Sequence, residues 1–244
     1  MIEQQVGHWQ PKWSVNNYGA QLHINDYNFP SGTICAIDVE TNGQDTDSAD
    51  FKIVCVGLTT DGIHIFVYFD PLHILWDWLR NILFVAHDGK SAEIPFLEKY
   101  GIKIEQLHFD TKTGYYVYNS ARKNYALKPL LKDLFNIEYP TYEEVISNKE
   151  FIQMTCDVHP EYMIQKKKGM VLPRELTLDK MDQQVVAEYN ASDVLWTFNL
   201  WVWLRTHFTS KHWNFFNNIE MPETRLIYLM EKQGIKIDTK AVRR

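Results

Sequence analysis

Hydrophobic and polar positions follow two patterns along the chain, one typical of strands and one typical of helices. Short apolar runs rich in β-branched and aromatic residues predict buried strands; they cover residues 33–40, 52–59, 63–69, 83–86 and 108–110. A turn sequence, Asp61-Gly62, joins the second and third runs. Because such a turn favours a hairpin, the first three runs predict an antiparallel meander.

Apolar residues at helical spacing predict helices between and after these strands. The predicted helices cover residues 71–80, 90–100, 111–119, 127–135, 182–207 and 220–232. Gly101 and Gly234 follow two of them, as is typical of a helix C-terminus. Strands first, and then strands alternating with helices, predict an α/β fold with a mixed sheet flanked by helices.

Two segments show no regular pattern. Residues 1–32 are rich in Asn, Gln and Gly with scattered aromatics, and we expect a weakly structured lead-in there. Residues 136–180 contain a lysine run at 166–168 and a proline at Pro173, which interrupt helical and strand patterns. We therefore expect a long irregular excursion, with the lysine run on a solvated loop rather than against a phosphate backbone.

Composition indicates one large domain, or one domain with an appendage, because 244 residues with 45% hydrophobic residues can form a substantial core. The formal net charge of −6 excludes a broad positive surface, so binding to nucleic acid would need a local groove or bound cations. Three widely spaced cysteines, Cys35, Cys55 and Cys156, fit neither a disulfide framework nor a zinc site. They favour a reducing cytoplasm.

Neither a signal peptide nor a membrane helix is predicted. The N-terminal sequence lacks the charged and then apolar pattern of a signal peptide. The longest apolar run, 194–204, is far shorter than the about 20 residues that a membrane helix needs. We expect no contact with a membrane.

Four acidic residues stand out by position. Asp38 and Glu40 end the first strand, and because alternate residues of a strand share a face, their side chains are predicted to project together. Glu93 begins a helix after the strand 83–86, and Asp193 lies one helical turn after Tyr189. Each alone has an ordinary explanation, as a solvated strand end, an acid favoured by the helix dipole, or a surface acid. The prediction of chemistry depends on the whole set.

Such a cluster implies bound cations. Two carboxylates about 4 Å apart at an effective dielectric constant near 20 repel each other by about 4 kcal/mol, so three or four cannot all stay ionised without positive charge. Ligand sets made of oxygen alone suit Mg²⁺ or Mn²⁺ rather than Zn²⁺. Two such ions can activate a water molecule and stabilise the leaving oxygen of a phosphodiester, and a tyrosine beside them can orient or deprotonate that water.

Three motifs resemble those of the DEDD exonuclease superfamily. DVET at 38–41 is similar to its first motif, and YNASD at 189–193 is similar to the third motif in its tyrosine-bearing form, DEDDy. The middle motif, at 87–97, matches the phage-type version in spacing. It departs from the pattern at two residues, since Asp88 stands where Asn is usual and Glu93 where Asp is usual. The longer glutamate shifts or weakens the second metal position, and Asp88 is the fallback ligand.

The resemblance extends beyond the acids. Residues 125–145 are similar to the segment between the second and third motifs in the exonuclease domain of family A, bacterial polymerase I-like, DNA polymerases. Residues 216–238 resemble the join between that domain and the polymerase domain. The likeness covers about residues 33–240 in all. It implies an RNase H-like exonuclease domain over 33–210 and a helical tail over 211–244 that resembles the start of a polymerase domain, after the unassigned lead-in 1–32.

The resemblance implies a 3′→5′ proofreading exonuclease that uses two divalent cations, Mg²⁺ or Mn²⁺. By motif matching, the metal ligands are Asp38, Glu40, Glu93 and Asp193. Tyr189 would lie beside the attacking water, and Thr41 matches a position that contacts the terminal nucleotide. His87 and Lys90 are further substrate-binding candidates, although a solvated lysine at a helix start is the simpler explanation of Lys90.

Single-stranded or frayed DNA 3′ ends are the implied substrate, and a DNA polymerase domain or subunit is the implied partner. The chain carries no palm or fingers, so we expect no polymerase activity from it, and it is either an excised domain or a separately encoded exonuclease. The implied location is the cytoplasm of a bacterial or phage-infected cell. Two alternatives stay open: an RNA-trimming exonuclease of the same superfamily, and a catalytically weakened binding or scaffold domain, for which the change at Glu93 is the motive.

Overall fold

Six strands form a mixed sheet in a computed structural model that describes residues 11–26, 32–43, 45–166 and 169–236. The strand order is β1-β4-β3-β2-β5-β6. Strands β2, β3 and β4 pair antiparallel, whereas β1 pairs parallel with β4, β5 with β2, and β6 with β5. The strands are β1 (Gln21–Ile24), β2 (Ile34–Thr41), β3 (Ile53–Thr59), β4 (His64–Tyr68), β5 (Leu83–Ala86) and β6 (Leu107–Asp110). The predicted meander and mixed sheet are confirmed.

The expectation of a weakly structured lead-in is wrong for residues 11–26. A 3₁₀ turn, Val15–Tyr18, precedes β1, and Val15 is fully buried. The Ser14 hydroxyl donates to Glu188 Oε1 over 3.0 Å, which joins this segment to a helix far along the chain. The sequence did not predict β1, because an edge strand of four residues gives little periodic signal. The rest of the predicted lead-in, 1–10 and 27–31, lies outside the described residues.

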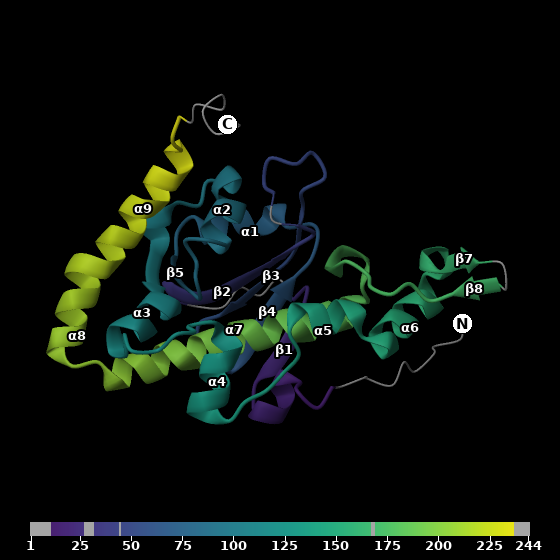
Figure 1. The fold of residues 1–244 in the computed structure, drawn as a ribbon, viewed down its shortest axis with the longest axis horizontal. Helices are drawn as coiled ribbons and strands as arrows, with labels where there is room; N and C mark the ends of the chain where they lie inside the picture. The colour runs from purple at the N-terminus through teal and green to yellow at the C-terminus, as the bar shows by residue number, and fades with distance from the viewer. Residues whose placement is uncertain (1–10, 27–31, 44, 167–168, 237–244) are drawn as a thin grey trace, which may run out of the picture.

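Nine α-helices surround the sheet within the described ranges, and the longest, α7, crosses one face of it (Figure 1). Helix α7 packs on β2, β3 and β4 and begins where the Asp182 side chain accepts bonds from the backbone N–H groups of the first turn. Almost every residue from Val185 to Trp201 is buried. The helices are α1 (His73–Leu79), α2 (Glu93–Leu97), α3 (Thr111–Tyr118), α4 (Leu127–Phe135), α5 (Tyr142–Ser147), α6 (Lys149–Val158), α7 (Gln183–His207), α8 (Ser210–Phe215) and α9 (Met221–Gln233).

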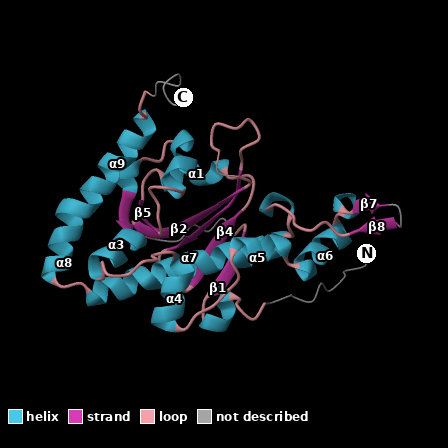
Figure 2. Cartoon of the chain, viewed as in Figure 1, coloured by secondary structure: helices cyan, strands magenta, loops and turns pink. Residues whose placement is uncertain are grey.

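The expectation of a long irregular excursion over 136–180 is wrong. Helices α5 and α6 lie in this segment, followed by a hairpin of β7 (Ile164–Lys166) and β8 (Gly169–Val171) at one end of the molecule (Figure 2). Side-chain caps explain these short helices: Thr141 and Glu144 form a capping box for α5, and Asn148 accepts bonds from the first turn of α6. Such caps stabilise short helices by satisfying backbone N–H groups of the first turn.

The last helices form one nearly continuous rod at the other end of the molecule (Figure 1). A π-helical turn, Phe216–Glu220, joins α8 to α9, which ends at Gly234 as the sequence predicts. The rod packs on the body through Phe216, which is fully buried and stacks on Phe109 with ring centroids 4.3 Å apart. No helix within the described ranges has the length and apolar character needed to span a membrane.

Candidate active site

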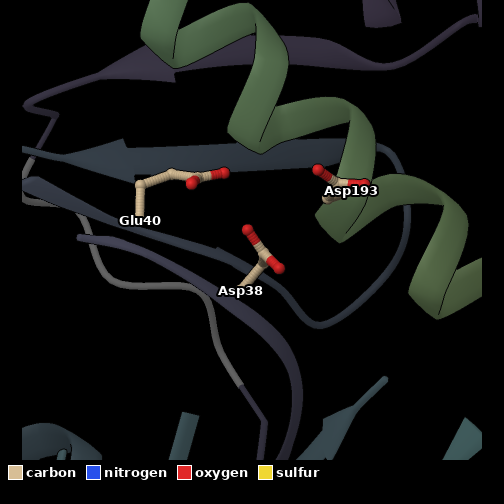
Figure 3. Close-up of side chains that lie close together, drawn as sticks. All are labelled: Asp38, Glu40 and Asp193. Carbon is tan, nitrogen blue, oxygen red and sulfur yellow. The ribbon is translucent and has the colours of Figure 1, made fainter. Parts of the chain in front are cut away.

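Three carboxylates from two distant parts of the sequence meet where β2 ends beneath α7. Asp38 and Glu40 project from the same face of β2, and Asp193 reaches them from α7 (Figure 3). One carboxylate oxygen from each residue lies within 4.8 Å of the others. The predicted convergence of these three side chains is therefore present, and it depends on how closely α7 approaches the sheet.

Glycine at position 57 permits this close approach. Gly57 pairs with Asp38 across the β2–β3 ladder, and a Cβ atom at Gly57 would lie 1.9 Å from Asn190 Oδ1 and 2.7 Å from Val194 Cγ2. The Asn190 amide instead fits over the strand, where Nδ2 donates to Asp38 Oδ2 over 2.7 Å and to the Asp38 carbonyl oxygen over 3.3 Å. Asn190 thus orients Asp38, a role that sequence reasoning missed although Asn190 lies within the third motif.

Burial and mutual repulsion oppose the ionised form of these acids. Burial raises the pKa of Asp38 to about 8, and the neighbouring Asp193 carboxylate adds to the shift. Burial, followed by the charges of Asp38 and Asp193, also raises the pKa of Glu40 well above its usual range. A cluster with these properties is stable in its ionised form only if cations neutralise it.

A lysine and a second tyrosine, both missed by sequence reasoning, complete the surroundings of Asp193. Lys128 Nζ lies 3.5 Å from Asp193 Oδ1 and donates to the Tyr189 hydroxyl oxygen over 3.2 Å. The Tyr139 hydroxyl donates to Asp193 Oδ1 over 2.6 Å. Burial and then the Asp193 charge raise the pKa of Tyr189, which keeps its hydroxyl neutral. A neutral phenol can orient a water molecule by hydrogen bonding, but it does not act as a general base.

Glu93 lies outside the group of three carboxylates. Its side chain is 4% exposed, and its Oε2 atom has no hydrogen-bond partner among the described residues. Burial, and then the charge of Asp38, raises the pKa of Glu93. The fallback residue Asp88 has a left-handed backbone with φ of 65°, and its carboxylate bonds to Lys112 and Ser91. Glu93 is therefore the acid with an uncommitted oxygen, whereas the Asp88 carboxylate is already paired.

The three predicted substrate-binding residues have partners within the protein. The Thr41 hydroxyl donates to the Gly43 carbonyl oxygen over 2.7 Å. His87 Nδ1 lies 2.8 Å from the Thr111 hydroxyl, and burial lowers the pKa of His87 to about 4, so the ring is neutral at neutral pH. Lys90 forms an ion pair of 2.6 Å with Glu231 on α9, which gives Lys90 a structural partner far along the chain.

A cleft of about 750 Å³ opens beside Glu40. Its walls come from the end of β2 and the loop after it, from the residues before and within α2, and from the start of α5. The lining residues are Val39, Glu40, Thr41, Gly43, Thr46, Asp88, Ser91, Ala92, Pro95, Phe96 and Tyr142. The cleft places polar and aromatic side chains next to the acids, and its volume suits a small ligand.

The donor set fits a divalent cation that prefers oxygen ligands. Asp38, Glu40 and Asp193 supply clustered carboxylate oxygens, and Glu93 supplies a buried oxygen that lacks a partner among the described residues. Hard cations such as Mg²⁺ and Mn²⁺ bind carboxylate groups of this kind. The raised pKa values of Asp38 and Glu40 are what a site that needs cation charge would show in the protein alone.

Comparison with known proteins gives the fold. No family model and no curated protein matches the chain. A solved structure of Brucella melitensis NrnC with bound Mg²⁺ is similar over 90% of this chain and 98% of that chain, with a TM-score of 0.53 and 18% sequence identity. A second structure of Brucella melitensis NrnC has a TM-score of 0.55 at 17% identity over the same shares.

A third similar structure is Escherichia coli RNase D, an exoribonuclease involved in structured RNA processing. The TM-score is 0.51 at 16% identity, and the match covers 84% of this chain and 46% of that chain. At these levels of identity the likeness concerns the fold. The expected fold is confirmed: the chain has an RNase H-like fold, with a mixed six-stranded sheet flanked by helices.

Proposed function

We propose that this protein is a metal-dependent 3′→5′ exonuclease that removes nucleotides from nucleic-acid 3′ ends by hydrolysis of phosphodiester bonds. The observation that carries the proposal is the meeting of Asp38, Glu40 and Asp193 within 4.8 Å under α7, on a sheet of the RNase H-like type. Tyr189 lies one helical turn before Asp193 and is buried beside it.

Each residue of the site has a distinct role in this proposal. Asp38, Glu40 and Asp193 hold a divalent cation, and Glu93 extends the set toward a second one. When bound, two such cations would lower the pKa of the attacking water and stabilise the leaving oxygen. Tyr189 keeps a neutral hydroxyl that orients the water by hydrogen bonding, while Asn190 holds Asp38 in place.

The cleft beside Glu40 would receive the terminal nucleotide. Phe96 and Tyr142 line it and offer aromatic surface on which a base can stack, and Thr41 lines the same cleft. The net charge of −6 disfavours long contact with a polyanion. A short binding site and a preference for single-stranded or frayed ends follow from this balance.

DNA is the first substrate that we propose, because the segments 125–145 and 216–238 resemble parts of family A DNA polymerases. A DNA polymerase domain or subunit stays a predicted partner on the same grounds. RNA is the second candidate, because the similar RNase D structure is that of an exoribonuclease. Cleavage rates on DNA and RNA oligonucleotides of matched sequence decide between the two.

The test uses 3′-labelled single-stranded DNA and RNA oligonucleotides with Mg²⁺. We expect release of labelled mononucleotides, loss of that release in EDTA, and loss in Asp38→Ala. Asp157→Ala is the matched control, since Asp157 is an exposed acid on α6. Full activity of Asp38→Ala contradicts the proposal. Oligonucleotide binding without any cleavage in Mg²⁺ or Mn²⁺ favours the catalytically weakened binding domain instead. Glu93→Asp is then the first substitution to test for a gain of cleavage.

A further inference from the structure

The Lys128 ammonium lies between two tyrosine rings beside Asp193. Lys128 belongs to α4, and its Nζ atom is 4.7 Å from the ring centroids of both Tyr139 and Tyr189. Contacts of this length are favourable cation–π interactions. Together with its bond to the Tyr189 hydroxyl, they fix the ammonium next to Asp193 Oδ1. A long lysine side chain would otherwise sample many rotamers.

Tyr139 contacts both charged groups. Its hydroxyl donates to Asp193 Oδ1, and its ring faces Lys128. The side chain is 9% exposed, and burial followed by the Asp193 charge raises the pKa of the hydroxyl, which keeps its proton. A phenol that bonds to a carboxylate over 2.6 Å forms a charge-assisted hydrogen bond, which is stronger than one between neutral groups.

The chain around Tyr139 is fixed on both sides. Asn136 ends α4 with a left-handed backbone at φ of 54°, and Thr141 begins α5 as the N-cap of a capping box. Pro140 follows Tyr139 directly, and a residue before proline is restricted to extended conformations. This short connection therefore presents the Tyr139 hydroxyl to Asp193 from a defined position rather than from a long loop.

We propose that Tyr139 is a positioning residue that holds Asp193 for cation binding and Lys128 against the Tyr189 hydroxyl. The inference rests on the proposed exonuclease function. Asp193 Oδ1 accepts from Tyr139 and pairs with Lys128, so the carboxylate cannot rotate freely. The Lys128 N–H donates to the Tyr189 phenol oxygen, so the Tyr189 O–H points away from the Lys128 ammonium. Removal of the Tyr139 hydroxyl releases Asp193, whereas the ring still faces Lys128.

Tyr139→Phe tests the inference, because it deletes one oxygen and keeps the ring. Loss of a residue that orients a metal ligand typically lowers metal affinity or activity by about 10- to 100-fold. We expect kcat to fall within that range, KM for the oligonucleotide to change less than about twofold, and Mn²⁺ binding measured by calorimetry to weaken by about 10-fold. The matched control is Tyr115→Phe, a buried tyrosine on α3 that contacts Tyr118 and Trp203.

The two readouts separate this inference from the proposed function. If the wild type cleaves, and Tyr139→Phe has unchanged kcat and unchanged Mn²⁺ affinity, the positioning role is overturned and the proposed exonuclease function stands. Absence of cleavage in the wild type overturns the exonuclease, and Mn²⁺ calorimetry on the two proteins then decides whether Tyr139 positions Asp193. Circular dichroism of both variants shows that each is folded. A rise in KM with unchanged kcat and Mn²⁺ affinity also contradicts the inference.

Discussion

Asp38→Asn is expected to stabilise the protein in the absence of metal while it abolishes activity. Two carboxylates 4.8 Å apart repel each other by about 3.5 kcal/mol at an effective dielectric constant near 20. The substitution removes the cost of burying the charged Asp38 carboxylate and its repulsion with Asp193, whereas Lys128 offsets part of that repulsion in the wild type. The new amide oxygen can still accept the hydrogen bond from Asn190. We expect a net gain of about 3 kcal/mol, of the order of one full pair.

The gain depends on pH in a direction that follows from the raised pKa of Asp38. Between the usual value of 3.8 and about 8, the unfolded chain has lost the Asp38 proton that the folded protein retains. The Asp38 contribution to wild-type stability therefore falls as pH rises through this window. Asp38→Asn lacks this loss, so its advantage over the wild type is larger at pH 9 than at pH 5.

Thermal unfolding in EDTA at the two pH values measures this difference. For a chain of this size, about 3 kcal/mol corresponds to a Tm increase of about 6–12 °C at pH 9. Saturating Mg²⁺ should raise the Tm of the wild type and leave that of Asp38→Asn nearly unchanged. Equal or lower Tm of Asp38→Asn in EDTA at pH 9 would refute the reasoning that repulsion among these acids destabilises the metal-free protein.

Three further predictions concern other parts of the site. Gly57→Ala places a Cβ atom against Asn190 and Val194, so it should destabilise the protein by about 1–3 kcal/mol and lower kcat. Urea unfolding measures the stability and nuclease assays measure kcat; wild-type values of both would contradict the close approach of α7 to β3. Glu93→Gln keeps the side-chain size but removes the charge, and we expect nuclease activity in Mg²⁺ to be about 100-fold lower. An unchanged rate in the same nuclease assay would mean that Glu93 holds no cation. Cations require ionised carboxylates, and below about pH 8 a proton on Asp38 competes with the cation. The Mg²⁺ concentration for half-maximal activity should therefore fall as pH rises from 6 to 8; a half-activating concentration that does not change with pH would contradict that link.

Length and apolar content explain which parts of the fold could be predicted from the sequence. Strands β2 to β5 are continuous apolar runs, and α7 is a long helix buried on nearly all sides, whose start is marked by the Asp182 side-chain cap. Strand β1 and helix α5 are short, and they depend on pairing with β4 and on a capping box rather than on a periodic pattern. Helix α6 buries an apolar stripe of Phe151, Ile152 and Cys156, so the sequence does carry a signal for it.

The candidate site shows the same division. The spacing of Asp38 and Glu40 places them on one face of a strand, and the structure has them there with Asp193. Lys128 and Tyr139 reach Asp193 across 65 and 54 residues of sequence, that is 193 − 128 and 193 − 139. Both lie in the segment 125–145 that carries the resemblance, but no residue pattern within it marks either as part of the site. Helix α2 begins only at Glu93, after turns that include Asp88, so Glu93 lies beside the acids rather than among them.

The burial of α7 also implies an order in which the molecule opens. Helix α7 is covered on nearly all sides from Val185 to Trp201, so the amide hydrogens of that stretch should exchange with solvent only when the whole domain unfolds. The connection that carries Tyr139 joins short, partly exposed helices, and such segments open at lower free energy. Local opening of this connection would then separate Tyr139 from Asp193 while the α7 backbone at Asp193 is still protected from exchange. Under mild denaturant or heat, turnover and cation affinity should therefore fall together, before α7 unfolds.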